Sequence, residues 1–104
     1  MKKIGHKKRV KRKSYKRALS NTKPEFYFVL NNGQKMKNLF DLVNALDKMP
    51  DDAFYHHVNE QRNDFSNWIR DIFKQKTLVN EISKTKNRLE TQVVLLKFIV
   101  KKLK

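Results

Sequence analysis

The stretch NLFDLVNALDKMP, from Asn38 to Pro50, decides the fold of this chain because it predicts an amphipathic helix with both ends marked. Asn38 is a preferred N-cap residue, since its side chain can accept a hydrogen bond from the first turn. Pro50 ends the pattern because proline cannot continue a helix. Between these two residues the apolar side chains recur at helical spacing: Leu39, Phe40, Leu42, Val43, Leu46 and Met49.

The residues before this helix predict a β-hairpin. Glu25 to Leu30 (EFYFVL) is rich in the aromatic and β-branched residues that strands favour. Asn31-Asn32-Gly33 follows, and Asn and Gly tolerate the positive φ angles of a tight turn. Gln34 to Lys37 is therefore expected to be the short returning strand.

The residues after Pro50 predict two further helices. Pro50-Asp51-Asp52 places proline and acids where a helix start favours them, and a modest apolar face follows. Asn63 or Asp64 is expected to cap the next helix, in which Trp68 should anchor the core. The wide apolar stripe of that helix consists of Phe65, Trp68, Ile69, Ile72 and Phe73.

The last segment, Thr77 to Lys104, contains no glycine or proline in 28 residues and predicts one helix about 40 Å long. Apolar residues follow a 3,4 spacing along it, interrupted once by Lys86. The domain's own shorter helices are the expected cover for this stripe, and a self-associating coiled coil is the alternative. A protein partner would dock through Ile82, Leu89, Val93, Leu96 and Val100.

Together these elements predict a mainly α (α+β) fold. A short N-terminal β-hairpin should precede a helical bundle with a long C-terminal helix, and the whole should follow a disordered basic arm. We expect the arm to span residues 1–21 and the small helical domain to span residues 22–104.

The charge of the chain is concentrated in this arm. The sequence holds 25 Lys and Arg against 10 acids, a net +15, and residues 1–20 contain ten of the bases and no acid. With little to bury and like charges throughout, the arm cannot offset its ordering entropy alone. The residues expected to contact phosphates or stack on bases are Lys2, Lys3, His6, Lys7, Lys8, Arg9, Lys11, Arg12, Lys13, Tyr15, Lys16 and Arg17.

A polyanion is the expected partner of such an arm, and RNA is favoured. A lipid surface would prefer Phe, Leu or Trp among the bases, and of these the arm has only Leu19. DNA is less favoured because no recognition-helix pattern flanks the arm. The sequence thus predicts a cytoplasmic ribosomal or ribosome-associated protein that contacts rRNA. The alternative is a helical protein interaction module that uses the C-terminal helix.

Enzymatic chemistry is not expected. The chain has no cysteine, which excludes disulfides and thiolate metal sites, and no apolar run fits a signal peptide or a membrane span. An acid/base or metal site could be imagined from His57 and Asp64. However, the adjacent His56 and His57 diverge by about 100° on a helix, so one should face inward and one outward. One histidine and Asn63 or Asp64 are expected to make capping and interhelix hydrogen bonds. We expect no metal, no cofactor and no small-molecule substrate.

One segment resembles a known family. The pair His57-Val58 and the pattern NDF-x-x-W-[IV]-x-D are similar to the signature of a small uncharacterised prokaryotic family that is frequent in archaea. The resemblance covers about residues 26–78 and implies a compact, mainly helical module with no assigned activity. Family members commonly continue with an acidic, Gly-containing stretch, whereas this chain has Lys74-Gln75-Lys76. The resemblance marks His57, Asn63, Asp64, Trp68 and Asp71 as a possible site.

Overall fold

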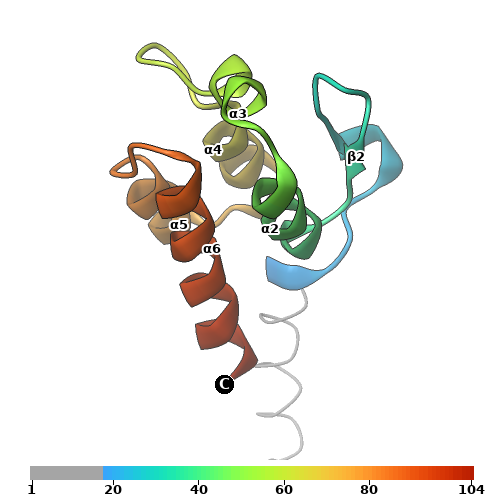
Figure 1. The fold of residues 1–104 in the computed structure, drawn as a ribbon. Helices are drawn as coiled ribbons and strands as arrows, with labels where there is room; N and C mark the ends of the chain where they lie inside the picture. Colours follow the sequence, from blue (N-terminus) through green and yellow to red (C-terminus); the bar gives the residue numbers. More distant parts are fainter. Residues whose placement is uncertain (1–17) are drawn as a thin grey trace, which may run out of the picture.

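The computed structural model describes residues 18–104, in which a short hairpin lies at one side of a group of helices (Figure 1). The mainly α fold with a hairpin is as predicted, while the predicted arm lies outside the described residues except for its last four positions. In chain order the elements are the 3-10 turn η1 (Pro24–Phe26), β1 (Phe28–Val29), β2 (Lys35–Met36), α2 (Leu39–Lys48), α3 (Asp51–His57), α4 (Asp64–Trp68), the π-helical turn η2 (Ile69–Phe73), α5 (Lys76–Ile82) and α6 (Arg88–Leu103).

The hairpin is shorter than predicted. Its strands are antiparallel, with Phe28 opposite Met36, and Gly33 adopts φ 90° in the turn. The predicted strand from Glu25 was too long because Pro24 opens η1 instead, and the N–H of Tyr27 donates to the Pro24 carbonyl at 3.2 Å. The fixed φ of proline suits the first position of a helical turn, which favours η1 over strand here.

The predicted helix starts at Asn38 and Asn63 are confirmed. The Asn38 side chain accepts from the N–H of Asp41 at 2.8 Å, and the Asn63 side chain accepts from the N–H of Ser66 at 3.0 Å. Both caps are local contacts, satisfying N–H groups that a helix start would otherwise leave unpaired.

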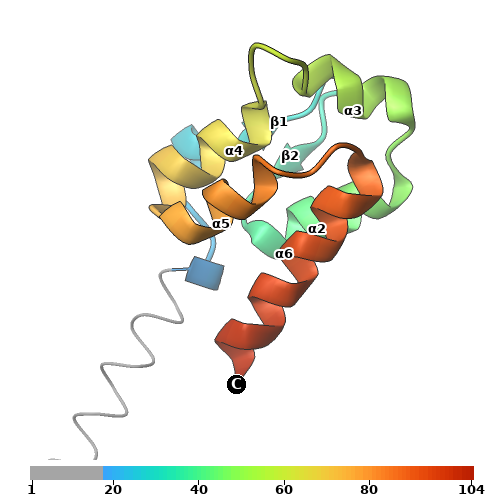
Figure 2. The ribbon, with the colours of Figure 1, turned by 90° about the vertical axis from the view of Figure 1, so that its left-hand side faces the viewer.

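The prediction of one helix over residues 77–104 was wrong. The chain forms α5 and α6, and the segment between them turns so that the two helices lie side by side (Figure 2). Asn87 starts α6 by accepting from the N–H of Glu90 at 2.8 Å, while Glu90 Oε1 accepts from the N–H of Lys86 at 2.8 Å. This reciprocal pair resembles a capping box and stabilises the break.

The core lies between α2, α4, α5 and α6, and Met36 of β2 and Phe54 of α3 are also buried in it. Trp68 is buried, as predicted for a core anchor, and η2 continues the buried face of α4 with Ile69 and Phe73. α6 packs on α2 and α5 through its Leu95 and Ile99 side. The fully buried large side chains are Met36, Leu39, Leu42, Leu46, Phe54, Phe65, Ile69, Leu78, Ile82, Thr91 and Leu95.

The core reaches further toward the N-terminus than the predicted boundary at residue 22. Ala18 and Leu19 are buried within it, and the N–H of Thr22 donates to the Lys37 carbonyl at 2.8 Å. Figures 1 and 2 show the start of the described chain and the C-terminal end of α6 at the same end of the molecule. The attachment point of the arm therefore lies at that end.

Candidate functional site

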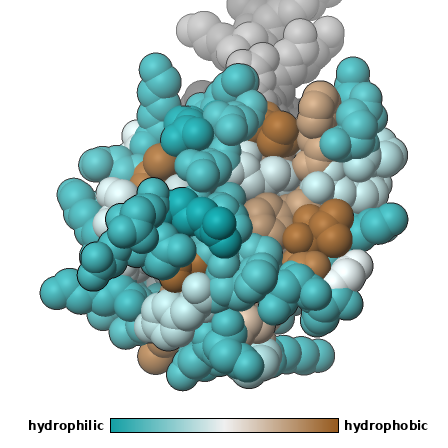
Figure 3. Space-filling view, turned by 90° about the horizontal axis from the view of Figure 1, so that it is seen from above, coloured by the Kyte–Doolittle hydropathy of each residue, from teal (hydrophilic) through white to brown (hydrophobic). Residues whose placement is uncertain are grey.

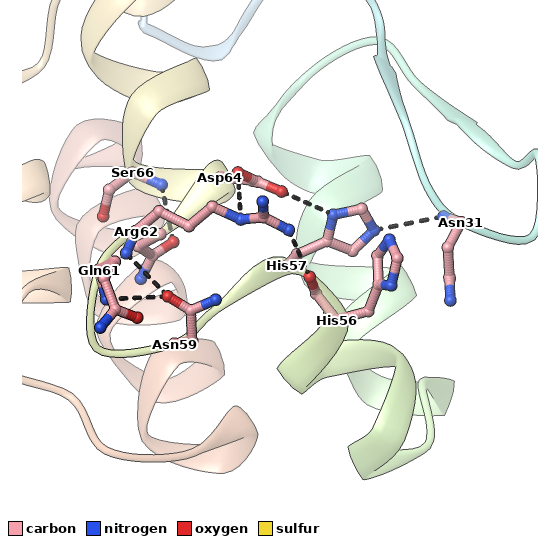
Figure 4. A network of polar contacts seen from close by, with 9 residues as sticks. Asn31, His56, His57, Asn59, Gln61, Arg62, Asp64 and Ser66 are labelled. Carbon is pink, nitrogen blue, oxygen red and sulfur yellow. Dashed lines mark hydrogen bonds and ion pairs between the residues drawn. The ribbon is translucent and has the colours of Figure 1, made fainter.

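The centre of the predicted site is a hydrogen-bonded cluster around His57, at the end of α3 (Figure 4). His57 Nδ1 lies 3.0 Å from Asp64 Oδ2, and the backbone N–H of Asn31 donates to His57 Nε2 at 3.2 Å. The ring is 6% exposed and packs edge-on against Phe28, with ring centroids 5.2 Å apart. His57 thus joins the hairpin turn, α3 and α4.

The contacts of His57 define its tautomer. A backbone N–H can only donate, so Nε2 accepts from Asn31 and carries no proton. Nδ1 then holds the ring proton and donates it to the Asp64 carboxylate. Both ring nitrogens are therefore engaged within the protein, an arrangement that serves to hold segments together.

The loop between α3 and α4 adds further polar contacts to the pair His57 and Asp64. Arg62 Nε lies 3.4 Å from Asp64 Oδ1, and Arg62 Nη2 donates to the His56 carbonyl at 2.9 Å. The Asn59 side chain accepts from the N–H groups of Gln61 and Arg62 at 2.8 and 3.0 Å. Asp64 consequently bridges a neutral histidine and a guanidinium.

Sequence reasoning missed the partners contributed by Asn31, Asn59 and Arg62. For Asn59 a signal existed, because an asparagine between two helices can form an Asx turn through N–H groups two or three residues on. For Asn31 there was none, since its bond to His57 spans 26 positions. The exposed His56 and buried His57 agree with the predicted inward and outward orientation.

The remaining signature residues do not all join this cluster. Asn63 caps α4, as described above. Trp68 Nε1 donates to the Phe26 carbonyl at 2.7 Å, tying α4 to η1. Asp71 lies apart, with its side chain 60% exposed and paired with Arg70 at 3.0 Å. The structure therefore unites His57, Asn63 and Asp64, places Trp68 beside them in the core, and leaves Asp71 at the surface.

Residues 18–104 contain no group of three or more His, Asp or Glu side chains that could hold a metal ion. Nor do these residues form a helix long and apolar enough to cross a membrane. Seen from the end that carries the α3–α4 loop, the surface is mostly hydrophilic, with apolar residues in separate patches (Figure 3).

The predicted phosphate-contacting residues, from Lys2 to Arg17, lie outside the described residues. Within the described part, charge is divided unevenly along the chain. Residues 74–104 hold nine Lys and Arg against two acids, a net +7, whereas residues 18–73 hold six against eight, a net −2. The helix pair α5–α6 is thus the basic part of the domain.

An open groove of about 810 Å³ runs between α5 and α6. Val93, Val94 and Phe98 line it together with lysines, and Lys102 Nζ lies 5.4 Å from the centre of the Phe98 ring.

Ile82, predicted to share a docking face with α6, is instead buried in α5. The expected cover of the stripe by the domain's own helices was also wrong, because its α6 members are exposed: Leu89, Val93, Leu96, Val100 and Leu103.

Fold and cluster together define a small, mainly helical domain in which a buried histidine ties a hairpin to two helices. The chain belongs to the DUF5752 family, a family of unknown function whose model matches residues 7–104. An uncharacterised family was predicted, but the match extends beyond residues 26–78 to α6 and to part of the basic arm. Neither the curated proteins nor the solved structures include one that matches the chain.

Proposed function

We propose that this protein binds RNA, and that it acts in the cytoplasm as a ribosomal or ribosome-associated protein. The observation that carries the proposal is the N-terminal arm, in which residues 1–20 hold ten Lys and Arg and no acid. These residues account for two thirds of the net charge of +15. A polyanion would neutralise this self-repelling charge, and release of its counterions would drive binding.

The charge of the described domain supports this proposal. The arm is attached at the end of the molecule where α6 terminates (Figure 1). The last turns of α6 carry Lys97, Lys101, Lys102 and Lys104, with no acid after Glu90. An RNA held by the arm could therefore also contact lysines of α6, making one continuous basic region.

RNA is preferred to DNA because no recognition-helix pattern precedes or follows the arm. The outward stripe of α6 is apolar, whereas base reading in a major groove uses Arg, Lys, Asn or Gln side chains. Contacts with phosphates position a protein on its target without selecting a base sequence. Under this proposal the arm supplies affinity, and the shape of the RNA together with the folded domain supplies placement.

The His57 cluster has a supporting role in the proposal. Its ring nitrogens are both occupied by protein partners, so we assign it to holding the hairpin and α3 against α4. On this assignment, the signature residues maintain the domain that carries the arm, and the protein is not an enzyme.

Salt-dependent binding tests the proposal. Affinity of the full chain for a structured rRNA fragment should fall by about 10³ to 10⁵ between 50 and 200 mM salt if six to ten bases meet phosphates. A variant lacking residues 1–17 should lose most of this affinity and salt dependence. The deletion must stop before Ala18 because Ala18 and Leu19 are buried in the core. Unchanged binding by the deletion variant would contradict the proposal.

A matched pair of charge variants tests the contribution of α6. Replacing Lys101 and Lys104 by Gln should weaken binding and lower the salt slope by about two, since each lost phosphate contact removes about one. Replacing Lys35 and Lys48 by Gln removes the same charge from exposed positions in the other part of the domain and should leave the slope unchanged. Equal effects of both pairs would indicate that only net charge matters.

A further inference from the structure

The exposed side of α6 carries a continuous apolar stripe. Leu89, Val93, Leu96, Val100 and Leu103 are each at least 40% exposed and are spaced by alternating steps of four and three residues. The other exposed large apolar residues of the described chain, Phe26, Val29, Phe40 and Tyr55, lie on different elements. An aligned apolar face of this kind marks an interaction surface, whereas single exposed residues need no explanation.

The residue types along the stripe indicate what covers it. In heptad notation Val93 and Val100 occupy a positions, and Leu89, Leu96 and Leu103 occupy d positions. β-branched residues at a with Leu at d favour a two-stranded parallel coiled coil. The side-chain pattern therefore fits a second α6 in the same orientation.

The stripe covers only about two heptads, but its helix is already folded. Short isolated helices are marginal because nucleation is costly. Here Leu95 and Ile99, on another side of α6, anchor the helix in the core, and Arg88 Nη1 donates to the Leu46 carbonyl at 2.7 Å. Pairing would therefore not have to provide the free energy that forms the helix.

The two edges of the stripe differ: the e edge is exposed, whereas the g edge, formed by Gln92 and Ile99, is buried against the domain. The e positions, on the side of the open groove, are Glu90, Lys97 and Lys104. On the opposite edge Gln92 occupies a g position, and its Nε2 donates to Asp47 Oδ1 of α2 at 3.2 Å. In a parallel pair the e edge of one helix faces the g edge of the other, so Lys97 of one copy would lie near Asp47 of the second.

We propose that the protein forms a homodimer through a parallel pairing of the α6 stripes of two copies. An antiparallel pair would bring both domains to the same side of the helix pair and place Lys97 of one copy near Lys97 of the other. A parallel pair places the domains on opposite sides. It also places both arm attachment points at one end, so that two arms would reach one RNA. The dimer stands independently of RNA binding.

Oligomeric state tests the pairing. Light scattering of the full chain, free of RNA and in 1 M salt to screen the arms, should give twice the monomer mass of 12.5 kDa at high protein concentration. Val100→Asp should make the protein monomeric. Val29→Asp is the matched control, because Val29 is 52% exposed and Val100 51% exposed, and it should leave the dimer intact. A monomer at every concentration, or equal loss of the dimer in both variants, would overturn the proposal.

Single cysteines test the orientation, since the chain has none of its own. Leu89→Cys and Leu103→Cys variants should each form a self-disulfide under mild oxidation if the helices are parallel. In an antiparallel pair each cysteine would lie about 21 Å from its equivalent, beyond disulfide reach. Crosslinking only when both cysteines are present in one chain would overturn the parallel arrangement. Circular dichroism of each variant checks that the fold is retained.

Discussion

Replacing His57 by phenylalanine tests whether the signature histidine holds the fold together. The substitution keeps an aromatic ring of similar size among Phe28 and Phe65, whose ring centroids lie 5.2 and 5.4 Å from that of His57. It removes the hydrogen bonds to Asn31 and Asp64. The variant therefore isolates the polar contribution of His57 from its packing.

The expected loss of stability is about 2–3 kcal/mol. A neutral hydrogen bond contributes about 1 kcal/mol and one to a charged group about 1.5–3 kcal/mol. The contribution of the His57–Asp64 bond should lie near the lower end of the range for charged groups, because the Asp64 side chain is 28% exposed and keeps its ion pair with Arg62. At about 4–8 °C per kcal/mol for a domain of this size, the Tm should fall by roughly 8–24 °C.

Urea unfolding followed by circular dichroism measures this loss, with His56→Phe as the matched control. His56 is the adjacent residue on the same helix and is exposed, so its substitution should change the free energy of unfolding by less than about 0.5 kcal/mol. A His57→Phe protein as stable as the wild type, or more stable, would refute the structural role. Stability gained on removing a polar residue is the signature of a site kept for function.

Three further substitutions check local features by the same urea assay. Asn87→Ala should destabilise the protein by about 1 kcal/mol because it removes the cap of α6, and an unchanged midpoint would mean that the helix break does not depend on this cap. Ser66→Ala should stabilise it by about 1 kcal/mol, since the Ser66 hydroxyl is buried with no partner among the described residues, and a loss would reveal a hidden partner. Gly33→Ala should destabilise it by about 1 kcal/mol because Gly33 has φ 90°, and a neutral result would show that the turn relaxes.

Features set by neighbouring residues were predictable from the sequence. The caps at Asn38 and Asn63 and the turn at Gly33 depend on contacts within a few positions, so residue type and spacing suffice. The break before α6 had a local signal as well. Asn87 with Glu90 three residues later is a helix-start pattern, and it outweighed the absence of glycine and proline.

Features set by distant residues were not predictable. The bonds of His57 to Asn31 and of Trp68 to Phe26 join positions 26 and 42 apart in the chain, and only the folded arrangement brings them together. Periodicity likewise identified the stripe of Val93 and Leu96 but could not say what covers it. In the fold, α6 packs on α2 and α5, and the side with Leu95 and Ile99 is buried while the stripe stays exposed.

Crosslinking in cells shows whether the basic arm binds RNA. Ultraviolet crosslinking, followed by sequencing of the attached RNA and identification of the crosslinked peptides, reports both partners at once. We expect ribosomal RNA recovered at one position, with crosslinks in residues 2–17. Recovery no greater than that of a protein lacking residues 1–17, or crosslinks confined to other parts of the chain, would show that the arm does not bind RNA.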